Sequence, residues 1–176
     1  MNMLRRISFP LLLATMILST VVLTSMALRA DDGSLLQIGD TMPAFSVLPL
    51  GATDSLRSAE LRGKPCAIVF FDSSCYDCRK ALPRVERMQR EFPNVCFLCI
   101  ARDQTAADVA QFWKQESLTL PVAAPGNREI YNLFARRTIP RLYVFTADGK
   151  LQKSFAEKLS VKSMRRALKA CCNDKL

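Results

Sequence analysis

The chain has 176 residues, enough for one domain with a buried core and too few for two comfortable ones. Its formal net charge is +9, but the basic residues are scattered rather than clustered with aromatics, which argues against a nucleic-acid partner. The sequence contains no histidine, and this excludes Ser–His and Cys–His nucleophile pairs and every His-ligated metal site. Any chemistry must therefore come from Cys, carboxylates, Lys, Tyr or the backbone.

The first 30 residues have the order of an export signal. Arg5 and Arg6 precede an uncharged apolar run over residues 7–28, and a positive start followed by an apolar core is typical of signal peptides. The run is also about long enough to span a bilayer as a helix, so an uncleaved membrane anchor is the alternative. We therefore expect residues 1–30 to be a signal peptide or anchor, and residues 31–176 to fold outside the cytoplasm.

The first half of this domain predicts two buried strands joined by a helix. A short edge strand at residues 45–50 precedes an apolar run at residues 66–71, whose branched and aromatic residues predict a buried strand. A helix follows, because apolar residues recur at helical spacing, and a second buried strand is predicted near residues 95–100. The apolar face of that helix consists of Ala81, Val85, Met88 and Phe92.

Two helices are predicted next. Thr105 and Asp108 form a capping box for a helix that ends near Glu116, and a second helix ends near Arg136. The side chains predicted to face inward from these helices are Val109, Phe112 and Trp113, followed by Ile130, Leu133 and Phe134.

The chain closes with a hairpin and a helix. Strands at residues 142–146 and 151–155 flank Asp148-Gly149, a dipeptide typical of two-residue hairpin turns. A last helix begins near Val161. Alternating strands and helices predict an α/β fold with a central mixed β-sheet flanked by helices, in which the hairpin supplies the antiparallel strands.

Cys75 and Cys78 lie on the turn between a predicted strand and a predicted helix. This placement exposes the first sulfur at a helix N-terminus, where unpaired backbone N–H groups favour the thiolate. The second sulfur lies one helical turn further on, close enough to form a disulfide. We predict that Cys75 attacks a partner's disulfide and that Cys78 resolves the mixed disulfide. A static structural disulfide is the alternative, although so short a bridge would constrain little of the chain.

Ile139 and Pro140 stand just before a predicted strand. A proline in this position can take a cis bond in a tight turn. If the turn packs beside the cysteine pair, its backbone can pair with the extended chain of a partner. We assign Ile139, Pro140 and Tyr76, which follows the first cysteine, to substrate binding.

Several motifs follow one another in a characteristic order over roughly residues 38–170. They are Gly39-Asp40-x-Met42-Pro43-x-Phe45, Cys75-x-x-Cys78-Arg79 with Pro83, and Ile139-Pro140 followed by Asp148-Gly149. In this order the chain resembles the TlpA/ResA-like branch of the thioredoxin superfamily.

The resemblance implies a thioredoxin-like fold with the nucleophile at Cys75, the resolving cysteine at Cys78 and a cis-proline at Pro140. It also implies a place in the periplasm or on the outer face of the bacterial inner membrane, and reduction of disulfides there. The implied partners are thiol- or disulfide-bearing envelope proteins and a membrane or periplasmic electron donor. No cofactor is expected.

Three positions depart from the family's pattern, and two of these departures remove its usual proton acceptors. Ser74 replaces a Trp, Ala81 replaces a Glu, and Val69 stands where thioredoxins carry a buried acid. Asp72 and Asp77 are the nearest carboxylates, and either is a candidate proton acceptor for the second cysteine.

Charges around the pair bear on its redox direction. Asp77 should disfavour the thiolate of the first cysteine, while Arg79 and Lys80 oppose that effect. We interpret the pair as a reducing couple.

The other cysteines leave alternatives open. Cys96 and Cys99 lie in a predicted strand, where residues three apart point to opposite faces, so we interpret them as buried core cysteines. With Cys75 and Cys78 they also match the spacing of a four-thiolate zinc site, although such sites use polar, Gly-rich knuckles.

The positions of three further cysteines suggest core or incidental thiols. Cys66 begins a predicted buried strand, Cys171 continues an apolar helix face, and Cys172 lies beside it. A last alternative concerns the whole domain: the lost Trp and Glu are also compatible with a thioredoxin-fold module that binds partners without turnover.

Overall fold

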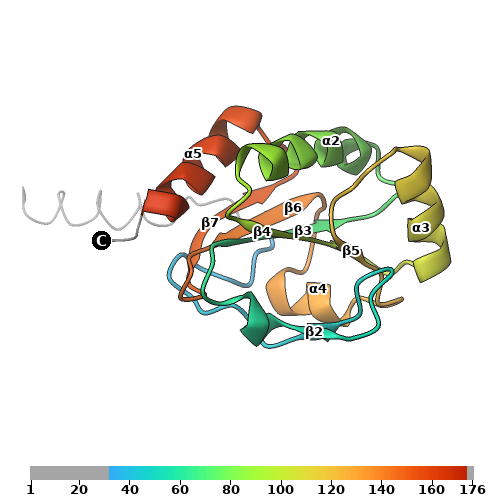
Figure 1. The fold of residues 1–176 in the computed structure, drawn as a ribbon, viewed down its shortest axis with the longest axis horizontal. Coiled ribbons are helices and arrows are strands. Elements are labelled where there is room, and N and C mark those ends of the chain that lie inside the picture. Colours follow the sequence, from blue (N-terminus) through green and yellow to red (C-terminus); the bar gives the residue numbers. More distant parts are fainter. Residues whose placement is uncertain (1–31, 174–176) are drawn as a thin grey trace, which may run out of the picture. The chain divides into compact units, whose positions relative to one another are not determined.

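A five-stranded mixed sheet forms the centre of the domain in the computed structural model, which describes residues 32–173 (Figure 1). The strands lie in the order β5-β4-β3-β6-β7. β4 is parallel to both of its neighbours, whereas β6 is antiparallel to both of its own. The predicted mixed sheet is therefore confirmed. The strands are β3 (Cys66–Phe71), β4 (Cys96–Ala101), β5 (Val122–Ala123), β6 (Arg141–Phe145) and β7 (Leu151–Ala156).

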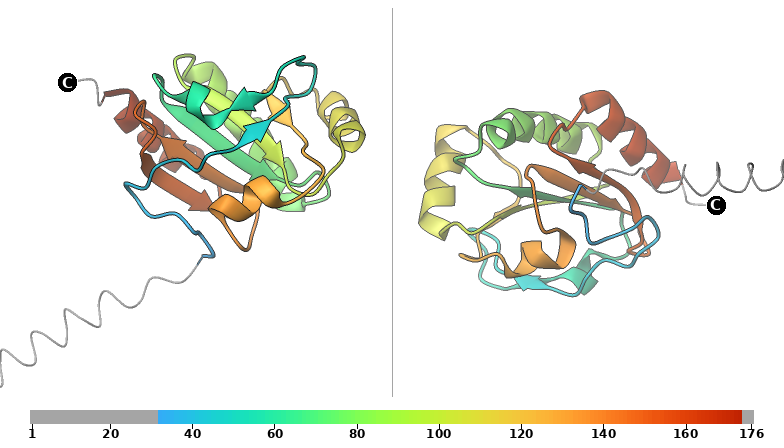
Figure 2. Two further views of the ribbon diagram at one scale, coloured as in Figure 1. Left: turned by 90° about the horizontal axis from the view of Figure 1, so that it is seen from below. Right: turned by 180° about the vertical axis from the view of Figure 1, so that it is seen from behind.

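Helices cover both faces of this sheet (Figures 1 and 2). α2 (Tyr76–Glu91) and α5 (Val161–Asn173) pack side by side on one face, and α4 (Glu129–Phe134) covers the other. α3 (Ala106–Gln115) lies at the β5 edge, and its buried side chains join the cluster under α2. Because both faces are covered, every residue of β3 is buried, which explains why that strand is a continuous apolar run.

Small elements extend the α4 face. β1 (Ser46–Val47) pairs antiparallel with β2 (Leu56–Arg57), and η1 (Ser58–Leu61) follows directly. The edge strand predicted at residues 45–50 is thus present but only two residues long. Its partner β2 has no hydrophobic periodicity that the sequence would reveal.

The predicted cap of α3 is present, but one side chain of α4 predicted to face inward does not. The Thr105 hydroxyl accepts a hydrogen bond from the N–H of Asp108 at 3.2 Å, so the predicted cap is confirmed. The prediction that Leu133 faces inward is wrong, because this side chain is 42% exposed. Tyr131 is buried in its place, and its ring lies 5.4 Å from that of Phe70.

The predicted export segment at residues 1–30 lies outside the described residues. Among residues 32–173, no helix is both long and apolar enough to cross a bilayer.

Candidate active site

The turn that carries the cysteine pair follows the carboxyl end of β3. Asp72 accepts hydrogen bonds from the backbone N–H and the hydroxyl of Ser74, at 2.8 and 2.7 Å. Gln104 accepts from the N–H of Ser73 at 2.8 Å and donates to its hydroxyl at 2.7 Å. Gln104 follows β4, the parallel neighbour of β3, so the sheet places both loops at the same edge. Sequence reasoning did not identify this contact.

Cys75 caps the N-terminus of α2 with its sulfur. Its Sγ accepts a hydrogen bond from the N–H of Cys78 at 3.3 Å, and its backbone is extended, as N-cap residues usually are. Backbone N–H groups at a helix N-terminus favour negative charge on such a sulfur. Cys75 is half-buried and Cys78 fully buried, and both are thiols. The first sulfur is therefore the one that a partner reaches.

The surroundings of Cys78 keep it protonated. Burial raises the pKa of this thiol well above its ordinary range, and the Cys75 thiol adds to the rise; the Asp72 backbone lowers the pKa, while the charge of the Asp72 carboxylate raises it by a smaller amount. Of the two candidate proton acceptors, Asp72 therefore lies close enough for its charge to act on Cys78. Asp77 is exposed in the first turn of α2. Proton acceptance by either carboxylate stays a prediction.

A cis peptide bond joins Ile139 to Pro140, so the conformation implied for this proline is confirmed. The Ile139 carbonyl lies 3.9 Å from the Sγ of Cys75, which donates to it. Tyr76, next to Cys75, is 68% exposed, and the Lys80 ammonium lies 4.0 Å from the centre of its ring. The three residues assigned to substrate binding therefore lie close to the candidate nucleophile, and the binding itself stays a prediction.

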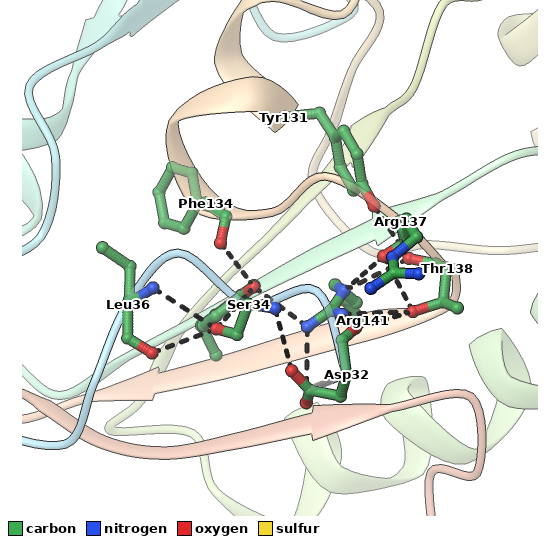
Figure 3. A network of polar contacts seen from close by, with 9 residues as sticks. Asp32, Ser34, Leu36, Tyr131, Phe134, Arg137, Thr138 and Arg141 are labelled. Atoms are coloured by element: carbon green, nitrogen blue, oxygen red, sulfur yellow. Dashed lines mark hydrogen bonds and ion pairs between the residues drawn. The ribbon is translucent and has the colours of Figure 1, made fainter. Parts of the chain in front are cut away.

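A buried arginine holds the backbone that leads into this cis bond (Figure 3). The Nε of Arg141 donates to the carbonyls of Arg137 and Thr138 at 3.0 and 3.2 Å, and its Nη2 to the Thr138 hydroxyl at 3.1 Å. Arg141 also donates to the carbonyl of Asp32, whose carboxylate lies 3.6 Å away. The Tyr131 hydroxyl reinforces the loop by donating to the Thr138 carbonyl at 2.9 Å.

Sequence reasoning missed this network. Its one visible signal is Arg141 itself, a charged residue at the head of an apolar strand and fully buried in the structure. Asp32 is 109 residues away in the chain, and Thr138 has a left-handed backbone with φ of 63°. Neither feature has a local sequence signature.

The two cations that follow the cysteine pair contact other groups. Arg79 donates to Glu116 at 2.6 Å, and its guanidinium lies 5.7 Å from the centre of the Phe112 ring. The Lys80 ammonium lies over Tyr76. Both cations predicted to support the nucleophile are thus directed to neighbouring side chains.

The positions of the cysteines disagree with a four-thiolate zinc site. Cys99 is buried under α2, whereas Cys96 packs on the opposite face of the sheet. Cys96 is paired with Cys66 at the amino end of β3, while Cys75 follows its carboxyl end. Within residues 32–173, no group of three or more His, Cys, Asp or Glu side chains is arranged to hold a metal ion. One interpretation needs correction: Cys96 is half-buried rather than a core residue.

Comparisons with known proteins identify the family of the chain. The family model of the AhpC/TSA family matches residues 38–154. Thiol-disulfide oxidoreductase ResA of Oceanobacillus iheyensis is 22% identical over 142 residues, covering 78% of this chain and 74% of that protein. ResA of Bacillus cereus is 26% identical over 122 residues, covering 68% of this chain and 70% of its own length.

Solved structures show the same fold. A thiol:disulfide interchange protein of the thioredoxin family from Chlorobium tepidum superposes with a TM-score of 0.67 at 22% identity, covering 77% of this chain and 98% of its own. An exposed lipoprotein thioredoxin from Streptococcus pneumoniae gives a TM-score of 0.64 at 20% identity, covering 73% and 99%. The fold is thus thioredoxin-like, and the chain belongs to the AhpC/TSA family, where it groups with the TlpA/ResA-like thiol–disulfide oxidoreductases.

Proposed function

We propose that this protein exchanges thiols and disulfides with envelope proteins through Cys75 and Cys78, and that it acts as a reductant. The observation that carries the proposal is the 3.3 Å hydrogen bond from the Cys78 N–H to the Cys75 sulfur at the N-terminus of α2. This contact places a backbone donor at the sulfur that a partner reaches, and a second thiol lies one turn away.

The reaction proceeds in two exchange steps. The Cys75 thiolate attacks the partner's disulfide, forms a mixed disulfide and releases one partner thiolate. The Ile139 carbonyl and the cis-proline backbone align the partner's extended chain during this step. Cys78 then gives its proton to Asp72 and attacks the Cys75 sulfur, so the partner leaves fully reduced. A membrane or periplasmic electron donor restores the two thiols.

The placement of the neighbouring cations supports the reducing direction. A couple becomes strongly oxidising when its thiolate is strongly stabilised, because this stabilises the dithiol. Here burial raises the pKa of the Cys78 thiol. Arg79 and Lys80, the nearest cations along the chain, contact Glu116 and Tyr76. Because neither cation is paired with the Cys75 sulfur in these contacts, they support a reducing rather than a strongly oxidising couple.

We place the domain in the periplasm or on the outer face of the inner membrane. The support is the order of Arg5 and Arg6 before the apolar run at residues 7–28, together with the relative named as an exposed lipoprotein. Residues 1–30 are proposed to be the export signal or anchor of a domain that spans residues 31–176.

The test is a redox titration of the full chain in non-denaturing detergent. The protein is equilibrated in glutathione buffers of graded potential, its free thiols are alkylated, and each cysteine is quantified by peptide mass spectrometry. Cys75 and Cys78 should switch together as one two-electron couple, with a midpoint closer to about −270 mV than to about −120 mV. A midpoint near the oxidising value would overturn the reductant assignment.

Turnover separates an enzyme from a module that only binds. The wild-type chain should reduce a disulfide peptide repeatedly when a dithiol regenerates it, and Cys75→Ser should abolish this. Cys99→Ser is the matched control, because Cys99 is a buried thiol of the same domain without a place at the turn. A wild-type chain that binds the peptide but releases no thiol would refute the proposal.

A further inference from the structure

A second pair of thiols faces one another at the amino ends of β3 and β4. Cys66 and Cys96 are register partners in the parallel ladder, and both contact the cluster on the α4 face. As register partners, their side chains lie on the same face of the sheet, and the pKa of each thiol depends on the other thiol. Neighbouring strands lie about 4.8 Å apart. This spacing falls within the Cα separations of about 4.4–6.8 Å that disulfides span.

Cys96 opens onto a groove at this end of the sheet. The groove has a volume of about 520 Å³ and lies between the loop that precedes β3 and the loop that precedes β4. Arg62 and Lys64 line it from the first loop, and Pro93 and Asn94 from the second. Small-molecule sites commonly have volumes of about 300–1,000 Å³, so the groove can hold a ligand the size of a tripeptide.

The charges around the groove favour an anion and a reactive sulfur. The neighbouring Cys66 thiol lowers the pKa of the Cys96 thiol to about 7, and the nearby Lys64 ammonium acts in the same direction against the effect of burial. Glu60, the acidic side chain that lines the groove, is paired with Arg57 at 2.7 Å. A thiol whose pKa lies near the ambient pH combines a large thiolate fraction with good nucleophilicity.

Cys66 lies where it can resolve a mixed disulfide formed on Cys96. It is buried, and the interaction with the Cys96 thiol is the largest cause of the raised pKa of its own thiol, followed by burial. When Cys96 enters a mixed disulfide, its negative charge disappears, and with it the Coulombic part of its effect on the Cys66 pKa. The Cys66 thiol then becomes easier to deprotonate, directly beside the sulfur that it would attack.

We propose that Cys96 and Cys66 form a second thiol–disulfide site, which reacts with small disulfides that carry carboxylate groups and bind in the groove beside Arg62 and Lys64. The Cys96 thiolate attacks one sulfur of the small disulfide, and the released thiolate takes up a proton. Cys66 loses its proton and attacks the Cys96 sulfur, which expels the second small thiolate. Two protein thiols are oxidised to one disulfide, and the small disulfide is reduced by two electrons to two thiols.

This site works apart from Cys75 and Cys78. Cys66 and Phe71 are five residue steps apart in β3, which at about 3.3 Å per step is about 17 Å. The two pairs therefore lie at opposite ends of one strand, too far apart to exchange directly. The second site can be tested in a variant that lacks the first, so failure of one proposal can be distinguished from failure of the other.

The test uses the full chain in detergent with Cys75→Ser and Cys78→Ser, treated with oxidised glutathione at pH 7. Intact mass and tandem mass spectrometry follow the products in time. One glutathionyl group should appear on Cys96 and then leave as a Cys66–Cys96 disulfide forms. Adding Cys66→Ser should hold the adduct on Cys96, and adding Cys96→Ser should leave Cys66 unmodified. Cys172, a half-exposed thiol of α5, is the internal control and should react about tenfold more slowly.

Charge recognition is tested with two disulfides that differ in charge. Arg62→Gln with Lys64→Gln should slow the reaction of Cys96 with oxidised glutathione about tenfold. The same change should slow the reaction with uncharged 2-hydroxyethyl disulfide by less than about threefold. Equal slowing of both would overturn the anion-binding groove. A stable Cys96 adduct in the presence of Cys66, a link from Cys66 to Cys171, or faster reaction at Cys172 would overturn the paired site.

Discussion

Replacing Arg141 with methionine should loosen the cis-proline loop while leaving the candidate nucleophile intact. The guanidinium is fully buried and donates to three backbone carbonyls, two of which belong to the residues just before the cis bond. Methionine fills a comparable volume without any donor. The substitution therefore isolates the polar contribution of Arg141 from its contribution to packing.

The expected loss is about 3 kcal/mol of the free energy of unfolding. A hydrogen bond to a charged group contributes about 1.5–3 kcal/mol, and removing one partner of a buried ion pair costs about 3–5 kcal/mol. We take the low end because the Asp32 carboxylate is 46% exposed. In addition, the Thr138 carbonyl keeps its bond from Tyr131, and the Arg137 carbonyl keeps one from the Thr138 hydroxyl at 2.7 Å.

The assay combines urea unfolding of the reduced full chain with kinetics on a disulfide peptide. Arg141→Met should lower the unfolding free energy as stated and raise the KM for the peptide by about tenfold, equivalent to ~1.4 kcal/mol. The rate at which Cys75 is alkylated should not change, because the sulfur and its helix cap are untouched.

Two further variants sharpen the comparison. Asp32→Asn removes the carboxylate but keeps the backbone carbonyl, and it should cost less than about 1 kcal/mol. Arg141→Lys should recover less than half of the loss, because one ammonium cannot reproduce a planar fork of donors. The reasoning is refuted if Asp32→Asn costs as much as Arg141→Met, or if Arg141→Met leaves both stability and KM unchanged.

Three other outcomes follow from the site. Cys78→Ser should leave the partner covalently held on Cys75, detectable as a stable mixed disulfide by non-reducing electrophoresis, whereas Cys99→Ser should release its partner normally. Asp72→Asn should slow resolution of the mixed disulfide about a hundredfold at pH 7 and Asp77→Asn hardly at all; faster resolution in Asp72→Asn would mean that the carboxylate acts on Cys78 only as a repelling charge. In Asp72→Asn, which lacks the carboxylate proposed to accept the Cys78 proton, the raised pKa of the buried Cys78 thiol should make stopped-flow resolution rates climb about tenfold per pH unit from pH 7 to 9, and a plateau near pH 7 in this variant would contradict the assigned environment.

Features set by adjacent residues could be read from the sequence. β3 is visible as an apolar run because helices cover both faces of the sheet, and the Thr105 cap is a contact between residues three apart. The placement of Cys75 at the start of α2 follows from the change of period between strand and helix. Each of these depends on a few consecutive side chains, which is the range over which sequence patterns carry information.

Features that depend on contacts between residues far apart in the chain could not be read from the sequence. β5 is two residues long and shows no period, so its bonds to β4 and its bridge to Pro49 define it. Tyr131 is buried instead of Leu133 because its ring packs on Phe70 and its hydroxyl donates a hydrogen bond to the Thr138 carbonyl. The pattern of apolar residues in the sequence does not show that a buried tyrosine hydroxyl has a hydrogen-bond partner. The contact between Arg141 and Asp32 depends on where a distant segment crosses the sheet.

The cysteines of the sheet illustrate how position along a strand decides reactivity. Cys99 lies in the middle of β4, where burial raises the pKa of its thiol and the charge of Glu86 raises it further, so it should resist alkylation until the domain unfolds. Cys75 lies beyond the carboxyl end of β3, where a helix N–H is available to its sulfur. Cys96 lies at the amino end of β4, where another thiol and Lys64 are available instead. Burial in the sheet interior protects Cys99, whereas Cys75 and Cys96 are partly exposed near the ends of their strands, so alkylation at pH 7 should modify Cys75 and Cys96 before Cys99.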